Sequence, residues 1–105
     1  MTAPVKVIRL RAYGQRVHAG AHAQQAHDQI VEVLRASGRV RLDFADVESV
    51  GATFLDRSLG TLLARHGVKV LRSIVFAHCS RSVEASIVKT LAQGAPSRGL
   101  FNFSG

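Results

Sequence analysis

Apolar residues recur along this chain with two periods that alternate from one segment to the next. Short β-branched or alternating runs, typical of strands, are followed by longer stretches whose apolar positions fall on one helical face. Leu55, Leu59, Leu62 and Leu63 form one such helical stripe. The pattern predicts strands at about 5–10, 39–44 and 73–78, and helices at about 20–37, 53–66 and 82–93.

The resulting order, β-α-β-α-β-α, predicts an α/β fold. Strands joined through crossover helices are most simply arranged as parallel neighbours in one sheet. We therefore expect residues 1–105 to form a single small domain, with a mostly parallel or mixed sheet of about four strands and three helices. The C-terminal tail, 95–105, alternates in polarity near its end and is expected to form a closing edge strand or to lie across the core. Partners of such sheets usually bind the loops at the carboxyl ends of the strands.

The composition is that of a globular protein with a basic surface. The chain is 47% hydrophobic and carries a net charge of +7, with eleven arginines and three lysines. This charge favours an acidic partner, nucleic acid or an anionic surface. The cations are scattered singly, however, without a helix-turn-helix spacing, so a basic nucleic-acid-associated protein stays as the alternative function. One cysteine and the absence of a long apolar run indicate a cytoplasmic protein without membrane association.

An acidic loop lies between the second predicted strand and the second predicted helix. Asp43, Asp46 and Glu48 are three of the chain's seven acids. Thr53 is expected to cap the helix, because its hydroxyl can accept from backbone N–H groups, and Asp56 completes a capping box. Asp43 and Asp56 are thus expected to hold the loop in shape. The loop lacks a neighbouring nucleophile, base or glycine-rich phosphate motif, which makes a hydrolase the weakest alternative.

Other reactive side chains favour structural roles. His18, His22 and His27 have spacings found on one helical face, but a metal site needs further ligands, so we expect solvated histidines and no metal or cofactor. Cys79 precedes a helix, whose dipole would stabilise a thiolate. Its neighbour His78 should point the other way in an extended segment, so a small buried or half-buried cysteine is the better interpretation.

Two more local predictions concern a cap and an aromatic side chain. Ser80 or Ser82 is expected to cap the last helix. Tyr13, flanked by Arg11 and Arg16, has the composition needed to stack on a base, which would serve the nucleic-acid alternative.

The segment VRLDFADVESVGATFLDRSLGTLLARHG resembles the core of the STAS fold, the sulphate-transporter and anti-sigma-factor-antagonist domain. It is more closely similar to a small bacterial STAS-like family of uncharacterised function. The shared pattern is a hydrophobic strand ending in Asp-Phe, an acidic loop to Val, and a small residue, Phe and Asp at the helix start. The matching residues are Asp43, Phe44, Val47, Thr53, Phe54 and Asp56. SIVFAHCSRSVEASI resembles the family's next strand and helix, so the resemblance covers about 16–91.

The resemblance also implies a possible phosphorylation switch. In anti-sigma-factor antagonists, a serine at the start of this helix is phosphorylated by a partner kinase with a histidine-kinase-like ATP fold, which breaks the complex. Aligned on the strand, that serine falls on Ala52 and the usual preceding aspartate falls on Gly51. Thr53 is one residue further along and is the candidate phosphoacceptor. A phosphate there would be favoured by the helix dipole and repelled by Asp46 and Glu48.

The resemblance implies a non-enzymatic protein-interaction module in bacterial signalling. The expected partner is a histidine-kinase-like ATPase or an anti-sigma-type regulator, and a homodimer is left open. The expected contact residues are Asp46, Glu48, Ser49, Thr53 and Arg57. The nucleic-acid alternative would be recognised by a steep loss of affinity with salt, because counterion release scales with the number of phosphate contacts.

Overall fold

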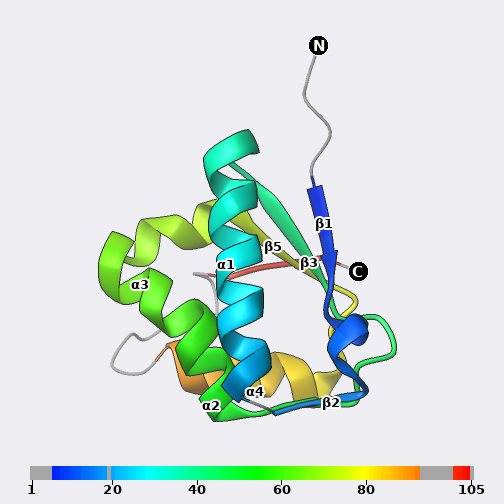
Figure 1. The fold of residues 1–105 in the computed structure, drawn as a ribbon. Helices are drawn as coiled ribbons and strands as arrows, with labels where there is room; N and C mark the ends of the chain where they lie inside the picture. Colours follow the sequence, from blue (N-terminus) through cyan, green and yellow to red (C-terminus); the bar gives the residue numbers. More distant parts are fainter. Residues whose placement is uncertain (1–5, 19, 93–100, 105) are drawn as a thin grey trace.

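A four-stranded parallel sheet forms the centre of the protein (Figure 1). The computed structural model describes residues 6–18, 20–92 and 101–104. The strands are β1 (Lys6–Arg9), β3 (Val40–Asp43), β5 (Ile74–Ala77) and β6 (Asn102–Ser104), in the order β1-β3-β5-β6. Each neighbouring pair is parallel. The α/β prediction with about four strands is confirmed, and the end of the tail is an edge strand.

Three helical segments connect the strands, as predicted. The first is α1 (Gly20–Ser37). The second is continuous through α2 (Ala52–Leu55), the π-helical segment η2 (Asp56–Gly60) and α3 (Thr61–His66). The third is α4 (Arg81–Leu91). Predicted residues 5 and 93 at the outer ends of a strand and a helix, and tail residues 95–100 and 105, lie outside the described residues.

Four short elements were not predicted. Strands β2 (Arg16–Val17) and β4 (Ser49–Val50) form a second, two-stranded parallel sheet at the carboxyl end of the central sheet. Two 3-10 helices, η1 (Leu10–Tyr13) and η3 (Val68–Ser73), follow β1 and α3. Strands of two residues are too short to give a period in the sequence, so only the folded chain reveals them.

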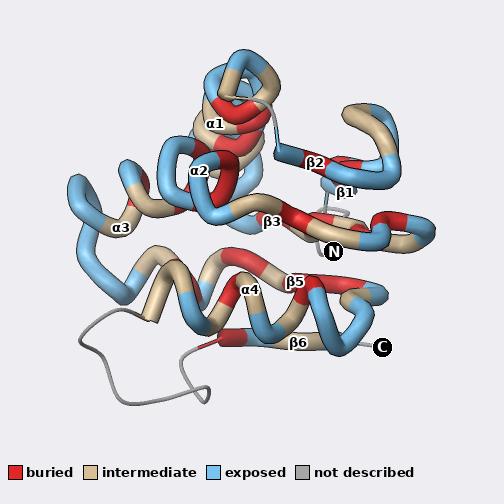
Figure 2. The backbone as a smooth tube through the Cα atoms, turned by 90° about the horizontal axis from the view of Figure 1, so that it is seen from below, coloured by how far each residue is buried: buried red, intermediate tan, exposed pale blue. Residues whose placement is uncertain are grey.

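In the described part of the chain, the helices cover one face of the central sheet, which places the core on that side (Figure 2). Ile8, Leu42 and Phe76 form one row across the sheet and are buried. The neighbouring row, Val7, Arg41 and Val75, faces the other way. Its side chains are partly or largely exposed, and Val7 at the sheet edge is 44% exposed. This explains the alternation of polarity seen along β3, because the polar positions point to the uncovered face.

The π-helical segment is stabilised by hydrogen bonds from a neighbouring helix. Ring nitrogen Nδ1 of His27, on α1, lies 3.0 Å from the carbonyl oxygen of Ser58 and 3.1 Å from Oγ1 of Thr61. The Thr61 hydroxyl donates to the Arg57 carbonyl at 2.9 Å, which leaves Nδ1–H of His27 as the donor to Ser58. The buried Ser58 hydroxyl donates to the Phe54 carbonyl. The expectation that His27 is a solvated histidine was therefore wrong.

Replacing His27 by Ala should lower the free energy of unfolding by about 1–2 kcal/mol, because the carbonyl of the buried Ser58 loses its hydrogen bond from the imidazole. His27→Asn keeps an N–H donor of similar reach and should lose less. Thermal unfolding followed by circular dichroism measures both changes. Equal losses for the two variants would show that the hydrogen bond to Ser58 contributes nothing.

The predicted cap of the second helix was wrong, whereas that of the last helix is confirmed. The helix begins at Ala52, with Gly51 as its N-cap residue, so Thr53 lies inside the first turn and forms no capping box with Asp56. The physical reason is that Gly51 is held against β2 and the residue after it: its N–H donates to the Val17 carbonyl, and a Cβ on Gly51 would lie 3.3 Å from His18 Cα. Asp56 instead packs against Gly60. At α4, Ser80 Oγ accepts from the Val83 N–H at 3.1 Å.

In the part of the chain that the structure describes, no helix combines the length and the apolar content that crossing a bilayer requires.

Candidate functional site

The carboxyl ends of β3 and β5 are joined by a side-chain contact. The carboxylate oxygen Oδ1 of Asp43, the last residue of β3, accepts from the Ala45 backbone N–H at 2.9 Å. The same oxygen lies 3.0 Å from Nδ1 of His78, the residue after β5. His78 is itself anchored, because its backbone N–H donates to the Ser104 carbonyl. Asp43 therefore holds two strand-to-helix connections in a fixed relation.

The pKa of Asp43 is lowered overall. Burial of the carboxyl group acts to raise it, but the hydrogen bond from Ala45 and the hydrogen bond and charge of His78, with a smaller effect of Arg9, outweigh burial. A folded-state pKa below the unfolded value of 3.8 means that ionised Asp43 favours the folded state above that pH. This contribution is lost as the pH falls through the folded-state pKa.

We expect the melting temperature of the wild type to fall more steeply below about pH 4 than that of Asp43→Asn. The amide keeps the shape of the side chain and an acceptor oxygen but cannot titrate. Melting curves recorded from about pH 6 down to about pH 2 compare the two proteins over the relevant range. Parallel pH profiles would show that Asp43 does not contribute to acid sensitivity.

Asp46 and His78 are the two non-glycine residues of the described chain with positive φ, 64° and 57°. Both lie at an open hollow of about 590 Å³ at the carboxyl end of the sheet. The lining residues are Gln15, Phe44, Asp46, Val47, Glu48, His78, Cys79 and Ser80. The left-handed conformation costs free energy in residues other than glycine. The surrounding structure therefore holds Asp46 and His78 in conformations that are unfavourable by themselves.

Cys79 is not suited to nucleophilic chemistry. Burial, and secondarily the charge of Asp43, raise the pKa of its thiol to about 12. The reactive form of cysteine is the thiolate, which such a pKa makes scarce at neutral pH. The thiol points toward the Ala77 carbonyl, with Sγ 4.0 Å from the oxygen.

Hydrogen bonds and an ion pair connect the acidic loop to the segment that follows η1. The backbone N–H of Glu48 donates to the Gln15 carbonyl at 2.7 Å. The Glu48 carboxylate lies 3.5 Å from Nε of Arg16, in an ion pair whose side chains are mostly exposed. Ser49 Oγ lies 2.9 Å from His18 Nε2. The sequence analysis missed these partners, since they lie about thirty residues away from the loop along the chain.

The remaining predicted contact residues lie on the adjoining helix. Thr53 and Arg57 are exposed, one turn apart, on α2 and the start of η2. The Arg57 guanidinium lies across Gly20 at the start of α1, where Nη1 would be 2.7 Å from a Cβ. Asp46 and Glu48 thus share the hollow, whereas Thr53 and Arg57 form a second patch outside its lining.

Tyr13 is not free to stack on a base. Its hydroxyl donates to Gln29 Oε1 at 2.8 Å, and its ring packs against those of His22 and Phe54, with centroids 5.2 and 6.3 Å away. Burial raises the pKa of its hydroxyl. Tyr13 therefore packs, partly buried, against the core and joins η1 to α1 and α2.

Comparison with known proteins agrees with this architecture. The family model described as a STAS-like domain of unknown function matches residues 22–84, from the first turns of α1 to the first turn of α4. No curated protein and no solved structure matches the chain significantly. The matched part contains β3, the acidic loop, the second helix and β5, on which the predicted resemblance rested. The chain therefore belongs to the family of STAS-like domains of unknown function.

Proposed function

We propose that this STAS-like domain is a non-enzymatic interaction module that binds a regulatory protein through the carboxyl end of its sheet. The rim surface is defined as the hollow residues Asp46 and Glu48 together with Ser49, Thr53 and Arg57. The partner proposed from the resemblance is a histidine-kinase-like ATPase or an anti-sigma-type regulator. Because the hollow presents two exposed carboxylates, the partner should carry basic residues where it contacts them.

The observation that supports this function most is the pair of left-handed residues, Asp46 and His78, on opposite connections of one rim. Strained backbone persists where the surrounding structure determines it, and such sites cluster at functional surfaces. Asp43 links the two connections, and backbone hydrogen bonds fix the acidic loop to β2. A surface organised in this way loses little conformational entropy on binding.

The same surface offers a position for regulation. Thr53 is exposed within the first turn of the helix, where free backbone N–H groups favour an added phosphate. Ala52, at the position of the serine used in anti-sigma-factor antagonists, has no hydroxyl group. We propose Thr53 as the phosphoacceptor, with a dianion there repelling the partner through added negative charge.

We expect the tagged wild-type chain to retain one protein from a nuclease-treated lysate of its own cells at about 0.15 M salt, where distant surface charges are screened. Thr53→Glu, which adds negative charge at the helix start, should retain several-fold less of that protein. Thr90→Glu, the same change near the end of α4 and away from the rim, is the matched control and should retain as much as the wild type.

Two results would contradict the proposal. Equal retention by wild type and Thr53→Glu would exclude the helix start from the contact. Recovery of nucleic acid from untreated lysate, with no protein retained from the treated lysate, would favour the alternative in which the dispersed arginines carry the function.

A further inference from the structure

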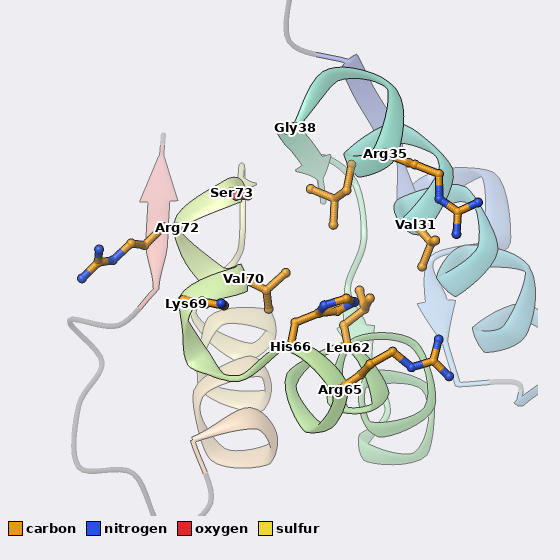
Figure 3. A pocket seen from close by; sticks show the side chains of 11 residues that line it. Val31, Arg35, Gly38, Leu62, Arg65, His66, Lys69, Val70, Arg72 and Ser73 are labelled. Atoms are coloured by element: carbon orange, nitrogen blue, oxygen red, sulfur yellow. The ribbon is translucent and has the colours of Figure 1, made fainter.

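A second pocket lies at the opposite end of the sheet, between the end of α1, the end of α3 and η3 (Figure 3). Its volume is about 630 Å³, within the range of pockets that hold small organic ligands. None of the rim residues lines it. It is therefore separate from the surface proposed for protein binding, and it is contributed by residues far apart in sequence, from Val31 to Ser73.

Four apolar side chains form part of the wall of this pocket. Val31 and Leu34 of α1, Leu62 of α3 and Val70 of η3 line it. Leu62 belongs to the buried core, whereas the other three are only partly buried. Figure 3 shows Val70 and the imidazole of His66 directed into the space between the helices. Filling such a space with an apolar group would remove the partly exposed valine and leucine side chains from water.

The charged side chains that line the pocket are all cationic. They are Arg35, Arg65, Lys69 and Arg72, and the described lining contains no Asp or Glu. Arg72 extends away from the space, and the guanidinium groups of Arg35 and Arg65 lie beyond Val31 on the side away from Val70, which leaves Lys69 as the cation beside Val70 (Figure 3). Arg35 and Arg65 are in the last turns of α1 and α3, where they also complement the negative helix ends.

The positive charge of Lys69 is not explained by a helix end. It lies in η3, outside α1 and α3. Arg35 and Arg65 also border an adjoining hollow that contains Asp28 and Glu32, but Lys69 does not line that hollow. Its positive charge beside apolar walls is complementary to a ligand with one acidic group and one apolar body.

We propose that the pocket between α1, α3 and η3 binds a small amphipathic organic anion, with its apolar body against Val31, Leu34, Leu62 and Val70 and its acidic group at Lys69. Burial of the apolar body supplies most of the affinity, and Lys69 selects the charge of the head group. The chemical class is an alkyl or aryl acid rather than a nucleotide, because the apolar walls would oppose several phosphate charges.

Decanoate, decanol and decylammonium provide a matched series with one tail and three head groups. Titration calorimetry with the full chain should give decanoate an affinity severalfold higher than decanol, and decylammonium the lowest, since one exposed cation contributes modestly. In the amide NMR spectrum, decanoate should shift signals from residues around Val31, Gly38 and Val70. Signals of the rim, including Asp46, should stay in place.

Two variants test the assignment of groups. Lys69→Glu should weaken decanoate binding about tenfold and leave decanol nearly unchanged. Lys89→Glu, the same change on α4 outside the pocket, should bind decanoate as the wild type does. Val70→Trp should fill the space and abolish binding of both ligands, with circular dichroism showing a folded protein. If Val70→Trp unfolds, the comparison of Lys69→Glu with Lys89→Glu still decides.

Equal affinities for the three head groups would overturn the proposal. Shifts confined to the rim or to the uncovered face of the sheet would place the ligand elsewhere and would also overturn it. Co-sedimentation with vesicles of phosphatidylglycerol, without binding of free decanoate, would assign the cations to a membrane surface instead.

Discussion

Replacing Phe76 by Ala should lower the free energy of unfolding by about 3–5 kcal/mol, the largest loss we expect from any single truncation in this chain. Phe76 is fully buried on β5, an interior strand of the sheet. Its ring centroid lies 6.4 Å from that of Phe44, 6.0 Å from that of Phe101 and 5.6 Å from that of Phe103. Truncation would leave a cavity bounded by two other strands and the chain that leads into β6.

Val7→Ala is the matched control for this prediction. Val7 lies on the uncovered face of the same sheet, 44% exposed, and its truncation should change stability by no more than about 0.5 kcal/mol. Denaturant unfolding at constant pH measures both variants. Comparable losses for Phe76→Ala and Val7→Ala would contradict a sheet with its core on one face.

Replacing Asp46 by Arg should weaken binding of the captured partner about a hundredfold, because it places like charges together at a contact that we propose to be basic on the partner's side. The backbone adds a second effect. Asp46 has a φ of 64°, a conformation that Asp and Asn adopt more readily than Arg. Asp46→Asn therefore separates the two causes, since it removes the charge and keeps the local conformation.

Asp46→Asn should lose less affinity than Asp46→Arg, and Asp28→Arg should lose none. Asp28 is exposed on α1 and does not line the hollow at the rim, so it matches the change in net charge without touching the contact. Calorimetric titration with the purified partner measures all three. A loss for Asp28→Arg equal to that for Asp46→Arg would mean that total charge, rather than the acidic loop, determines binding.

The periodicity of apolar residues predicts most of the fold. The bounds expected for α1, Gly20–Ser37, are those observed, because a regular apolar stripe is followed by Ser-Gly at a helix end. The strands β3 and β5 are each one residue shorter at both ends than expected, a difference typical of element boundaries. These elements can be predicted because their apolar residues recur with the period of a helix or a strand over several neighbouring positions.

Contacts between distant segments account for what the sequence did not predict. The hydrogen bond of His27 to Ser58 spans thirty-one residues and reverses the expectation of a solvated histidine. The close approach of His18 to Gly51 makes glycine, rather than Thr53, the N-cap. Neither contact can be predicted from the period of apolar residues, because each depends on how two elements pack.

In the candidate site, too, the local features were predicted and the contacts between distant segments were not. The sequence predicted the acidic loop after the second strand and Asp46 and Glu48 as contact residues, and the structure shows both side chains exposed. The sequence did not predict that His78, thirty-five residues beyond Asp43, would bond to it and border the same hollow. It also missed the pocket around Lys69, because the lining residues come from α1, α3 and η3, which lie together only in the folded chain.

Hydrogen-deuterium exchange of the protein with and without its captured partner tests the central claim most directly, since it maps the contact without altering any residue. Binding through the rim predicts slower exchange of amides at about 45–54 and 78–81, with little change in β1 and at the end of α1. Protection restricted to the uncovered face of the sheet, or to α1 and η3, with unchanged exchange at 45–54, would contradict it.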